Sequence, residues 1–108
     1  MIFFKNTVKD EFTVEFEALE GEESIGRCTL NLNNNLADVT QLSFSDNAPY
    51  AVEGLLRSAY NYAGLKNYYF ARCSALNIES FLDKMNFEKR SDGYYGDIPS
   101  ILMGSCCK

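Results

Sequence analysis

The segment that decides the fold reads LADVTQLSFSDNAPYAVEGLLRSAYNYAGLKNYYFARC and spans residues 36–73. Residues 36–44 follow an asparagine-rich turn and are predicted to form a strand. The pattern changes at residues 46–49 (DNAP), because Asp and Asn cap helices and Pro suits the first helical turn. The sequence therefore predicts a strand that leads directly into a helix.

The predicted helix carries one apolar stripe, and a second strand follows it. Apolar residues recur at spacings of three and four, at Val52, Leu55, Leu56, Ala59 and Ala63. We expect Gly64 to supply the left-handed residue that ends the helix. Residues 67–73 (NYYFARC) are short and rich in aromatic side chains, which is typical of a buried strand parallel to residues 36–44. The three elements form a βαβ unit with a right-handed crossover.

The chain before this unit reads as an antiparallel meander. Residues 11–19 alternate between apolar and polar side chains, as a strand with one wet face does. Residues 21–23 turn the chain, and residues 24–32 alternate again, so the two segments form a hairpin that residues 36–44 extend. Residues 1–7 leave two alternatives open: an additional strand, or a cover over a cleft.

The chain after the unit is predicted to form a second helix and a final hairpin. The helix begins near Ser74 or Asn77, which are both good caps, and ends at Asn86 in the left-handed conformation. Its apolar face consists of Ile78, Phe81, Leu82 and Met85. Residues 87–90 and the segment from Tyr94 onward form the hairpin, and Pro99 indicates that the last segment is an edge strand or is interrupted.

Composition limits the classes of function. The 108 residues, 46% of them hydrophobic, are too few for two cores, so residues 1–108 are expected to form one domain. No run approaches the ~20 apolar residues that span a bilayer, which predicts a cytoplasmic protein without a membrane partner. Because 15 acidic residues outweigh 10 basic ones, we expect no nucleic-acid partner.

The chain has no histidine, which excludes Ser-His-Asp triads, Cys-His pairs and imidazole acid–base catalysis. The four cysteines lack the spacing of metal ligands, so no metal is expected. Cys28 and Cys73 are interpreted as small buried apolar residues. Cys106 and Cys107 lie beside the C-terminal lysine, and a thiol handle for redox chemistry is a further hypothesis for them.

Three segments, taken in order, resemble the GNAT N-acetyltransferases. They are residues 38–44 (DVTQLSF) leading into the helix with residues 55–59 (LLRSA), residues 68–72 (YYFAR), and residues 81–87 (FLDKMNF), which is similar to the common family run Phe-Tyr-Glu-Lys-Leu-Gly-Phe. The resemblance covers residues 11–95. It implies an α+β fold whose mixed sheet has an antiparallel meander, a βαβ unit with a parallel pair, a second helix and a final hairpin. The usual two N-terminal helices have no room before Glu11. Another two-layer α+β sandwich, such as a ferredoxin-like domain, is the alternative.

The resemblance implies acetyl-CoA as the acyl donor. In this family the strands corresponding to residues 36–44 and 67–73 separate, and the pantetheine arm lies between them like an added strand. Backbone groups near Leu42, Ser43 and Phe44 would hold that arm. Amides at the helix N-terminus, near Ala48, Tyr50, Ala51 and Val52, would bind the pyrophosphate. Asn77, at the start of the second helix, is the remaining predicted cofactor contact.

Two departures from the family pattern bear on this expectation. The family's phosphate loop carries a basic residue and closely spaced glycines, whereas residues 46–52 (DNAPYAV) contain neither. Asp46 would repel phosphate, and Pro49 lacks an amide donor. Leu82 stands where the family often has the tyrosine that protonates the leaving thiolate.

Two functions follow as hypotheses. The first is an acyltransferase in which a small-molecule or peptide amine attacks the acetyl-CoA thioester, Asp38 accepts the proton through water, and the thiolate leaves without a dedicated acid. The alternative is a non-catalytic binding or interaction module that has lost the phosphate loop. Because the missing N-terminal helices would leave apolar sheet surface uncovered, we also expect a homodimer.

Overall fold

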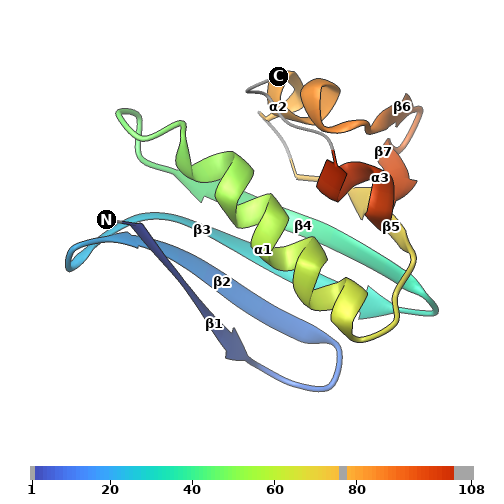
Figure 1. Ribbon diagram of the computed structural model, residues 1–108, viewed down its shortest axis with the longest axis horizontal. Coiled ribbons are helices and arrows are strands. Elements are labelled where there is room, and N and C mark those ends of the chain that lie inside the picture. Colours follow the sequence, from blue (N-terminus) through green and yellow to red (C-terminus); the bar gives the residue numbers. More distant parts are fainter. Residues whose placement is uncertain (1, 76–77, 104–108) are drawn as a thin grey trace.

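The computed structural model describes residues 2–75 and 78–103, and a mixed seven-stranded sheet forms its framework. The strand order is β1-β2-β3-β4-β5-β7-β6 (Figure 1). The strands are β1 (Ile2–Val8), β2 (Thr13–Glu20), β3 (Glu23–Asn33), β4 (Leu36–Phe44), β5 (Phe70–Cys73), β6 (Glu88–Arg90) and β7 (Gly93–Asp97). The α+β architecture expected from the sequence is confirmed.

Strands β1 to β4 form the antiparallel meander, and β4 then pairs with β5 in parallel, as predicted. The asparagine turn between β3 and β4 uses the left-handed conformation at Asn34 and Asn35. The N-terminal segment is an additional strand, because all of β1 pairs with β2 from Ile2↔Glu20 to Val8↔Val14. This decides between the two alternatives for residues 2–7, and Met1 lies outside the described residues.

Helix α1 (Ala51–Leu65) lies across one face of the meander and forms the second layer (Figure 1). Its apolar stripe meets the alternate residues of β2 that point the same way, Val14, Phe16 and Ala18. Leu55, Leu56 and Tyr60 are completely buried in this core. Burial of this helix face, rather than helix propensity, holds α1 in place.

No helix of residues 2–75 and 78–103 covers the opposite face of the meander, and the side chains on this face of β2 and β3 are largely polar. Glu17 on β2 forms an ion pair with Arg27 on β3, with 3.0 Å between Oε2 and Nη2. Glu15 and Thr29 form the next cross-strand pair on this face. The prediction of an uncovered apolar surface is therefore wrong for β2 and β3, because the polar residues that alternate along both strands make this face stable in water. Homodimerisation stays a prediction.

Helix α1 ends differently from the prediction. Gly64 is helical, and Asn67 is the left-handed residue, with φ of 72°. The amide of Tyr68 donates to the carbonyl of Ala63, and the amide of Asn67 donates to that of Gly64, both at 3.0 Å. This is the Schellman arrangement with asparagine in place of glycine.

The C-terminal part follows the predicted order with shorter elements. The second helix consists of α2 (Glu79–Leu82) and a 3₁₀ turn, η1 (Asp83–Met85), and it ends at the left-handed Asn86 as expected. The predicted hairpin is the pair β6 and β7. Pro99 lies in the first turn of α3 (Ile98–Met103), so the segment is interrupted by a helix.

The two described cysteines are buried, as predicted, and each is a free thiol. Burial raises the pKa of Cys28 and of Cys73 to about 12. Cys106 and Cys107 lie outside the described residues. Across residues 2–75 and 78–103, no cluster of three or more Cys, Asp or Glu side chains could hold a metal ion. No helix in those ranges is long and apolar enough to cross a membrane.

Two glycines of α1 give a matched pair of stability variants. Gly64→Ala is expected to raise the free energy of unfolding by about 0.5–1 kcal/mol, because alanine favours the helix and its methyl group meets only an ordinary contact with Ile98. A methyl group at Gly54 would collide with the Phe4 ring of β1, so Gly54→Ala should gain less or destabilise. Urea unfolding measures both. If the Phe4 ring causes the difference in the free energy of unfolding between Gly64→Ala and Gly54→Ala, that difference should disappear when both variants also carry Phe4→Ala. A difference that persists in the Phe4→Ala background would contradict the packing of Phe4 against Gly54.

Thiol reactivity tests the buried cysteines. In a variant with Cys106→Ser and Cys107→Ser, Cys28 and Cys73 should resist an aromatic disulfide reagent at pH 8, because their pKa of about 12 leaves little thiolate and the core excludes the reagent. The same variant in denaturant should react at both thiols. Rapid labelling of the native protein would contradict the packing described here.

Candidate functional site

The candidate site lies where β4 and β5 separate. Their parallel pairing runs from Leu36↔Phe70 to Val39↔Cys73, and the amide of Ser74 then donates to the carbonyl of Val39 at 3.0 Å. Beyond this point β4 continues to Phe44 with β3 as its only strand partner among the described residues. Within the described part of the chain, one edge of the second half of β4 therefore lacks a neighbouring strand.

A bulge sets which backbone groups face this opening. The β3–β4 register passes from Leu30↔Val39 to Thr29↔Gln41, so Thr40 is the additional residue. The amide of Ser45, just after β4, donates to the carbonyl of Ile25 in β3. Since backbone groups alternate along an antiparallel strand, those of Ser43 also face β3.

The same alternation directs the backbone groups of Leu42 and Phe44 toward the opening. Two of the three residues predicted to hold the pantetheine arm therefore present their backbone groups to the opening. The backbone groups of Ser43, the third of these residues, belong to the β3 ladder.

Apolar side chains surround the opening. The rings of Phe44 and Phe81 meet edge to face, with 6.1 Å between their centroids. Leu42 is half-buried against the core, and Leu82 of α2 is completely buried. Leu82 therefore fills the core as its helical stripe predicts, and it offers no proton to a leaving thiolate.

Tyr60 of α1 fixes the strands at the point of separation. Its hydroxyl donates to the carbonyl of Arg72 on β5 at 2.6 Å, and its ring packs against Phe87 with 5.7 Å between centroids. Burial raises the pKa of Tyr60 well above its ordinary value. This tyrosine is a structural residue that anchors β5 to the helix layer.

Asp38, the predicted base, lies on the uncovered face of β4 beside the point of separation. Its carboxylate accepts a hydrogen bond from Ser74 Oγ at 3.1 Å and pairs with Arg72 Nη1 at 3.4 Å. Burial raises the pKa of Asp38, although the hydrogen bond from Ser74 and the charge of Arg72 act in the opposite direction. A carboxylate that is held in place and less acidic than usual is suited to accept a proton.

Asp38 opens into a cavity of about 470 Å³ on the uncovered face, which we call the Asp38 hollow. Thr40 and Leu36 flank the carboxylate along β4, and the mostly exposed Phe12 lies at the margin. The remaining lining residues are Asn31, Leu32, Asn33 and Arg72. The hollow thus joins a carboxylate, apolar walls and amide groups at the strand separation.

Sequence reasoning missed Arg72 and Ser74 as partners of Asp38. The pairing Asp38↔Arg72 depends on the register between two parallel strands, which the hydrophobic pattern does not reveal. A charged residue in the otherwise apolar strand at residues 67–73 was the available signal.

The predicted phosphate site at the start of α1 differs from the expectation of unpaired amides. The amide of Ala48 donates to the carbonyl of Ser45 at 2.8 Å, that of Ala51 to Ala48 at 3.1 Å, and that of Val52 to Pro49 at 3.2 Å. The side chains of Ala48, Ala51 and Val52 are buried. The expectation of unpaired amides is wrong for Ala48, Ala51 and Val52, because consecutive turns at the start of α1 already use these N–H groups as hydrogen-bond donors.

The surroundings of this turn are acidic. Tyr50 is about half exposed, and its hydroxyl donates to Glu20 Oε1 at 2.8 Å, so its side chain points to the β2–β3 hairpin. Hydrogen bonding to Glu20 raises the pKa of Tyr50. Asn77, the last predicted contact, lies outside the described residues.

Coenzyme A therefore fits the site in part. The free edge of β4 and its apolar surroundings suit an extended thioester arm, which would add to the sheet as a strand does. The start of α1 does not suit a pyrophosphate, because the amides of Ala48, Ala51 and Val52 are occupied and Glu20 and Asp46 bring negative charge.

Comparison with solved structures gives the fold. No protein-family model matches the sequence, and no curated protein matches it. The PaiA N-acetyltransferase of Thermoplasma acidophilum, solved in complex with coenzyme A, is similar with a TM-score of 0.65 and 17% identity over 78% of this chain. A GNAT-family acetyltransferase of Staphylococcus aureus gives 0.67 and 13% over 80%, and YhhK of Escherichia coli bound to coenzyme A gives 0.61 and 12% over 82%.

The matches cover different shares of these proteins. This chain spans 58% of the Thermoplasma protein, 68% of the Staphylococcus protein and 73% of the Escherichia protein. The resemblance inferred from residues 38–44, 68–72 and 81–87 is thus confirmed at the level of fold. The described part of the chain has the fold of the GNAT N-acetyltransferases.

Proposed function

We propose that this protein binds an acyl-CoA thioester through its acyl-pantetheine arm and transfers the acetyl group to an amine. The observation that carries the proposal is the free edge of β4 at Leu42 and Phe44, with Asp38 a few residues away on the uncovered face. Structural neighbours with this fold were solved with coenzyme A, which supports the same class of ligand here.

The chemistry follows from the residues on both sides of the opening. Backbone groups of β4 hold the arm and polarise the thioester carbonyl. The amine nitrogen bonds to the carbonyl carbon, the carbon–sulfur bond breaks, and the electron pair leaves on the thiolate. Asp38 accepts the amine proton through water, while Arg72 and Ser74 keep the carboxylate oriented. Since Leu82 is apolar and buried, the thiolate leaves without an acid from this position.

The second candidate is a non-catalytic interaction module, the alternative already drawn from the sequence. The occupied amides of Ala48, Ala51 and Val52 and the buried Leu82 favour it, since both features remove parts that a CoA-dependent transferase commonly uses. In that case the opening at β4 would bind a strand of a partner protein. Ligand binding separates the two candidates.

Binding should depend on the arm and little on the nucleotide. We expect S-acetylpantetheine and acetyl-CoA to raise the melting temperature saturably, with Kd values within about tenfold of each other, because the turn before α1 adds few phosphate contacts. Adenosine bisphosphate alone should give no shift. A shift with adenosine bisphosphate and none with S-acetylpantetheine would place binding at the turn. No shift with any of the three would favour the interaction module.

Asp38 should control the rate of transfer. Asp38→Asn is expected to lower kcat for amine acetylation by about 10²–10⁴-fold, because the amide cannot accept the proton. In the parent protein the rate should fall as the pH drops through the pKa of Asp38, which burial raises above the ordinary aspartate value, and the variant should lack this limb. Asp92→Asn is the control, because Asp92 also contacts Arg72 but is exposed. Equal rates for Asp38→Asn and Asp92→Asn would contradict the assigned role.

A further inference from the structure

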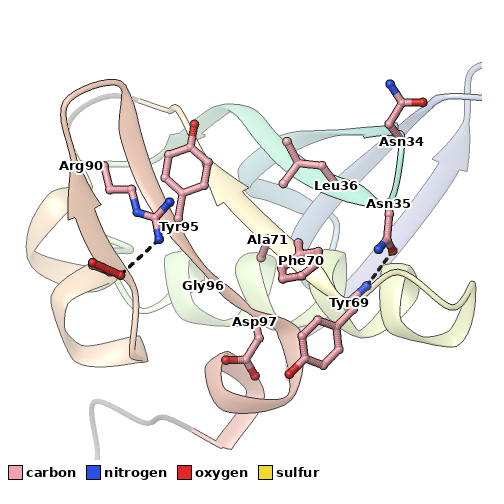
Figure 2. Close-up of a pocket in the computed structure, with 11 residues that line it drawn as sticks. Asn34, Asn35, Leu36, Tyr69, Phe70, Ala71, Arg90, Tyr95, Gly96 and Asp97 are labelled. Atoms are coloured by element: carbon pink, nitrogen blue, oxygen red, sulfur yellow. Dashed lines mark hydrogen bonds and ion pairs between the residues drawn. The ribbon is translucent and has the colours of Figure 1, made fainter.

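A second cavity adjoins the Asp38 hollow on the uncovered face. It measures about 560 Å³, and we call it the Phe70 hollow. Leu36 lines both cavities, so they adjoin at this residue, and we call the two together the groove. Figure 2 shows Asn34 and Asn35 at one side of the Phe70 hollow, Tyr95 and Arg90 at the other, and Leu36 and Phe70 between them. This groove is larger than a small amine requires.

The apolar floor of the Phe70 hollow is exposed. Phe70 and Tyr69 are 52% and 50% exposed, and their rings stand at right angles with 5.0 Å between centroids. Phe70 pairs with Leu36 on the neighbouring strand. An exposed aromatic pair of this kind stabilises a ligand that brings an apolar side chain.

Side-chain amides border the groove along its length. Asn31 and Asn33 line the Asp38 hollow, and Asn34 and Asn35 line the Phe70 hollow. Asn35 Oδ1 accepts from the Tyr69 amide at 3.3 Å, while the side chains of the other three have no hydrogen-bond partner within residues 2–75 and 78–103. A side-chain amide offers a donor and an acceptor together, which matches the peptide groups of a polypeptide.

The charge of the groove is acidic. Its lining includes three carboxylates, Asp38, Glu88 and Asp97, and two guanidinium groups. Arg72 pairs with Asp38 and Arg90 pairs with Glu88, at 3.4 Å in each case, so Asp97 is the lining carboxylate that has no ion-pair partner among the described residues. Arg90 also lies 4.9 Å over the Tyr95 ring. The groove therefore complements a ligand with positive charge.

The length of the groove fits a short stretch of extended chain. Asp38, Arg72, Tyr95 and Glu88 form one row across β4, β5, β7 and β6. Three strand spacings of about 4.8 Å make this row roughly 14 Å long, which about four to five extended residues span.

We propose that the amine acceptor is the N-terminus of an extended, positively charged peptide, with its α-amine at Asp38 and its following residues over Leu36 and Phe70. This assignment rests on the proposed acetyl transfer and names its acceptor. The asparagine amides bind the peptide backbone, Phe70 takes an apolar side chain, and Asp97 attracts a cationic one.

A length series tests the acceptor. The acceptors are alaninamide and the amidated peptides Ala-Leu-Phe and Ala-Leu-Phe-Lys-Gly, with acetyl-CoA as donor. We expect kcat/KM to rise with length by about tenfold or more from alaninamide to the pentapeptide. Phe70→Ala and Asn33→Ala change exposed side chains. In each variant, the ratio of kcat/KM for the pentapeptide to kcat/KM for alaninamide should fall about tenfold. Leu65→Ala is the matched control, because Leu65 is an exposed apolar residue at the C-terminal end of α1 that does not line the groove.

A binding measurement keeps this test separate from the transfer reaction. Fluorescence anisotropy follows the pentapeptide, labelled at its C-terminus, without acetyl-CoA. Binding that Phe70→Ala weakens supports the groove even where no acetyl transfer occurs, and that result would overturn the proposed transferase function alone. Equal kcat/KM along the series, without pentapeptide binding, would overturn the peptide acceptor and leave a small amine as the substrate. Neither binding nor transfer would overturn both.

Discussion

The structure depends on the point at which β4 and β5 stop pairing. Up to Val39 and Cys73 the two strands form an ordinary parallel ladder, and beyond it the β4 edge has no strand neighbour among the described residues. Tyr60 holds this point from the helix layer through a fully buried hydroxyl that donates to β5. The bulge at Thr40 then turns alternate backbone groups of β4 toward the opening. A free backbone edge inside a sheet is a recognition surface for an extended ligand.

The two faces of the sheet contribute different chemistry to this point. The face under α1 is apolar and supplies Leu42, Phe44 and the core beneath them. The uncovered face supplies Asp38, whose carboxylate is positioned by two neighbours from the end of β5. A thioester held at the free edge of β4 would meet an amine that approaches from the uncovered face. The occupied turn before α1 shifts the expected binding energy from the nucleotide to the arm.

The sequence predicted the elements better than their contacts. Alternation and helical spacing predicted β4 with its observed bounds, the crossover, and the left-handed Asn86, because each is a local property of side-chain size and backbone freedom. Asp38 was found as a candidate, yet its partner Arg72 depends on a register that the pattern does not contain. The amides of Ala48 and Val52 were expected to be unpaired, and only the conformation of the turn shows their partners. Gly64 was expected to end α1, whereas the left-handed residue is Asn67, three positions later.

The most direct test of this account is amide hydrogen exchange of single residues, measured by NMR with and without S-acetylpantetheine. Without ligand, the amides of Leu42 and Phe44 should exchange rapidly, while those of Ser43 and Ser45, which face β3, should be protected. Ligand should protect Leu42 and Phe44 and leave Ala48 and Val52 unchanged. Protection confined to Ala48 and Val52, with unchanged exchange at Leu42 and Phe44, would contradict a binding site on the free edge of β4.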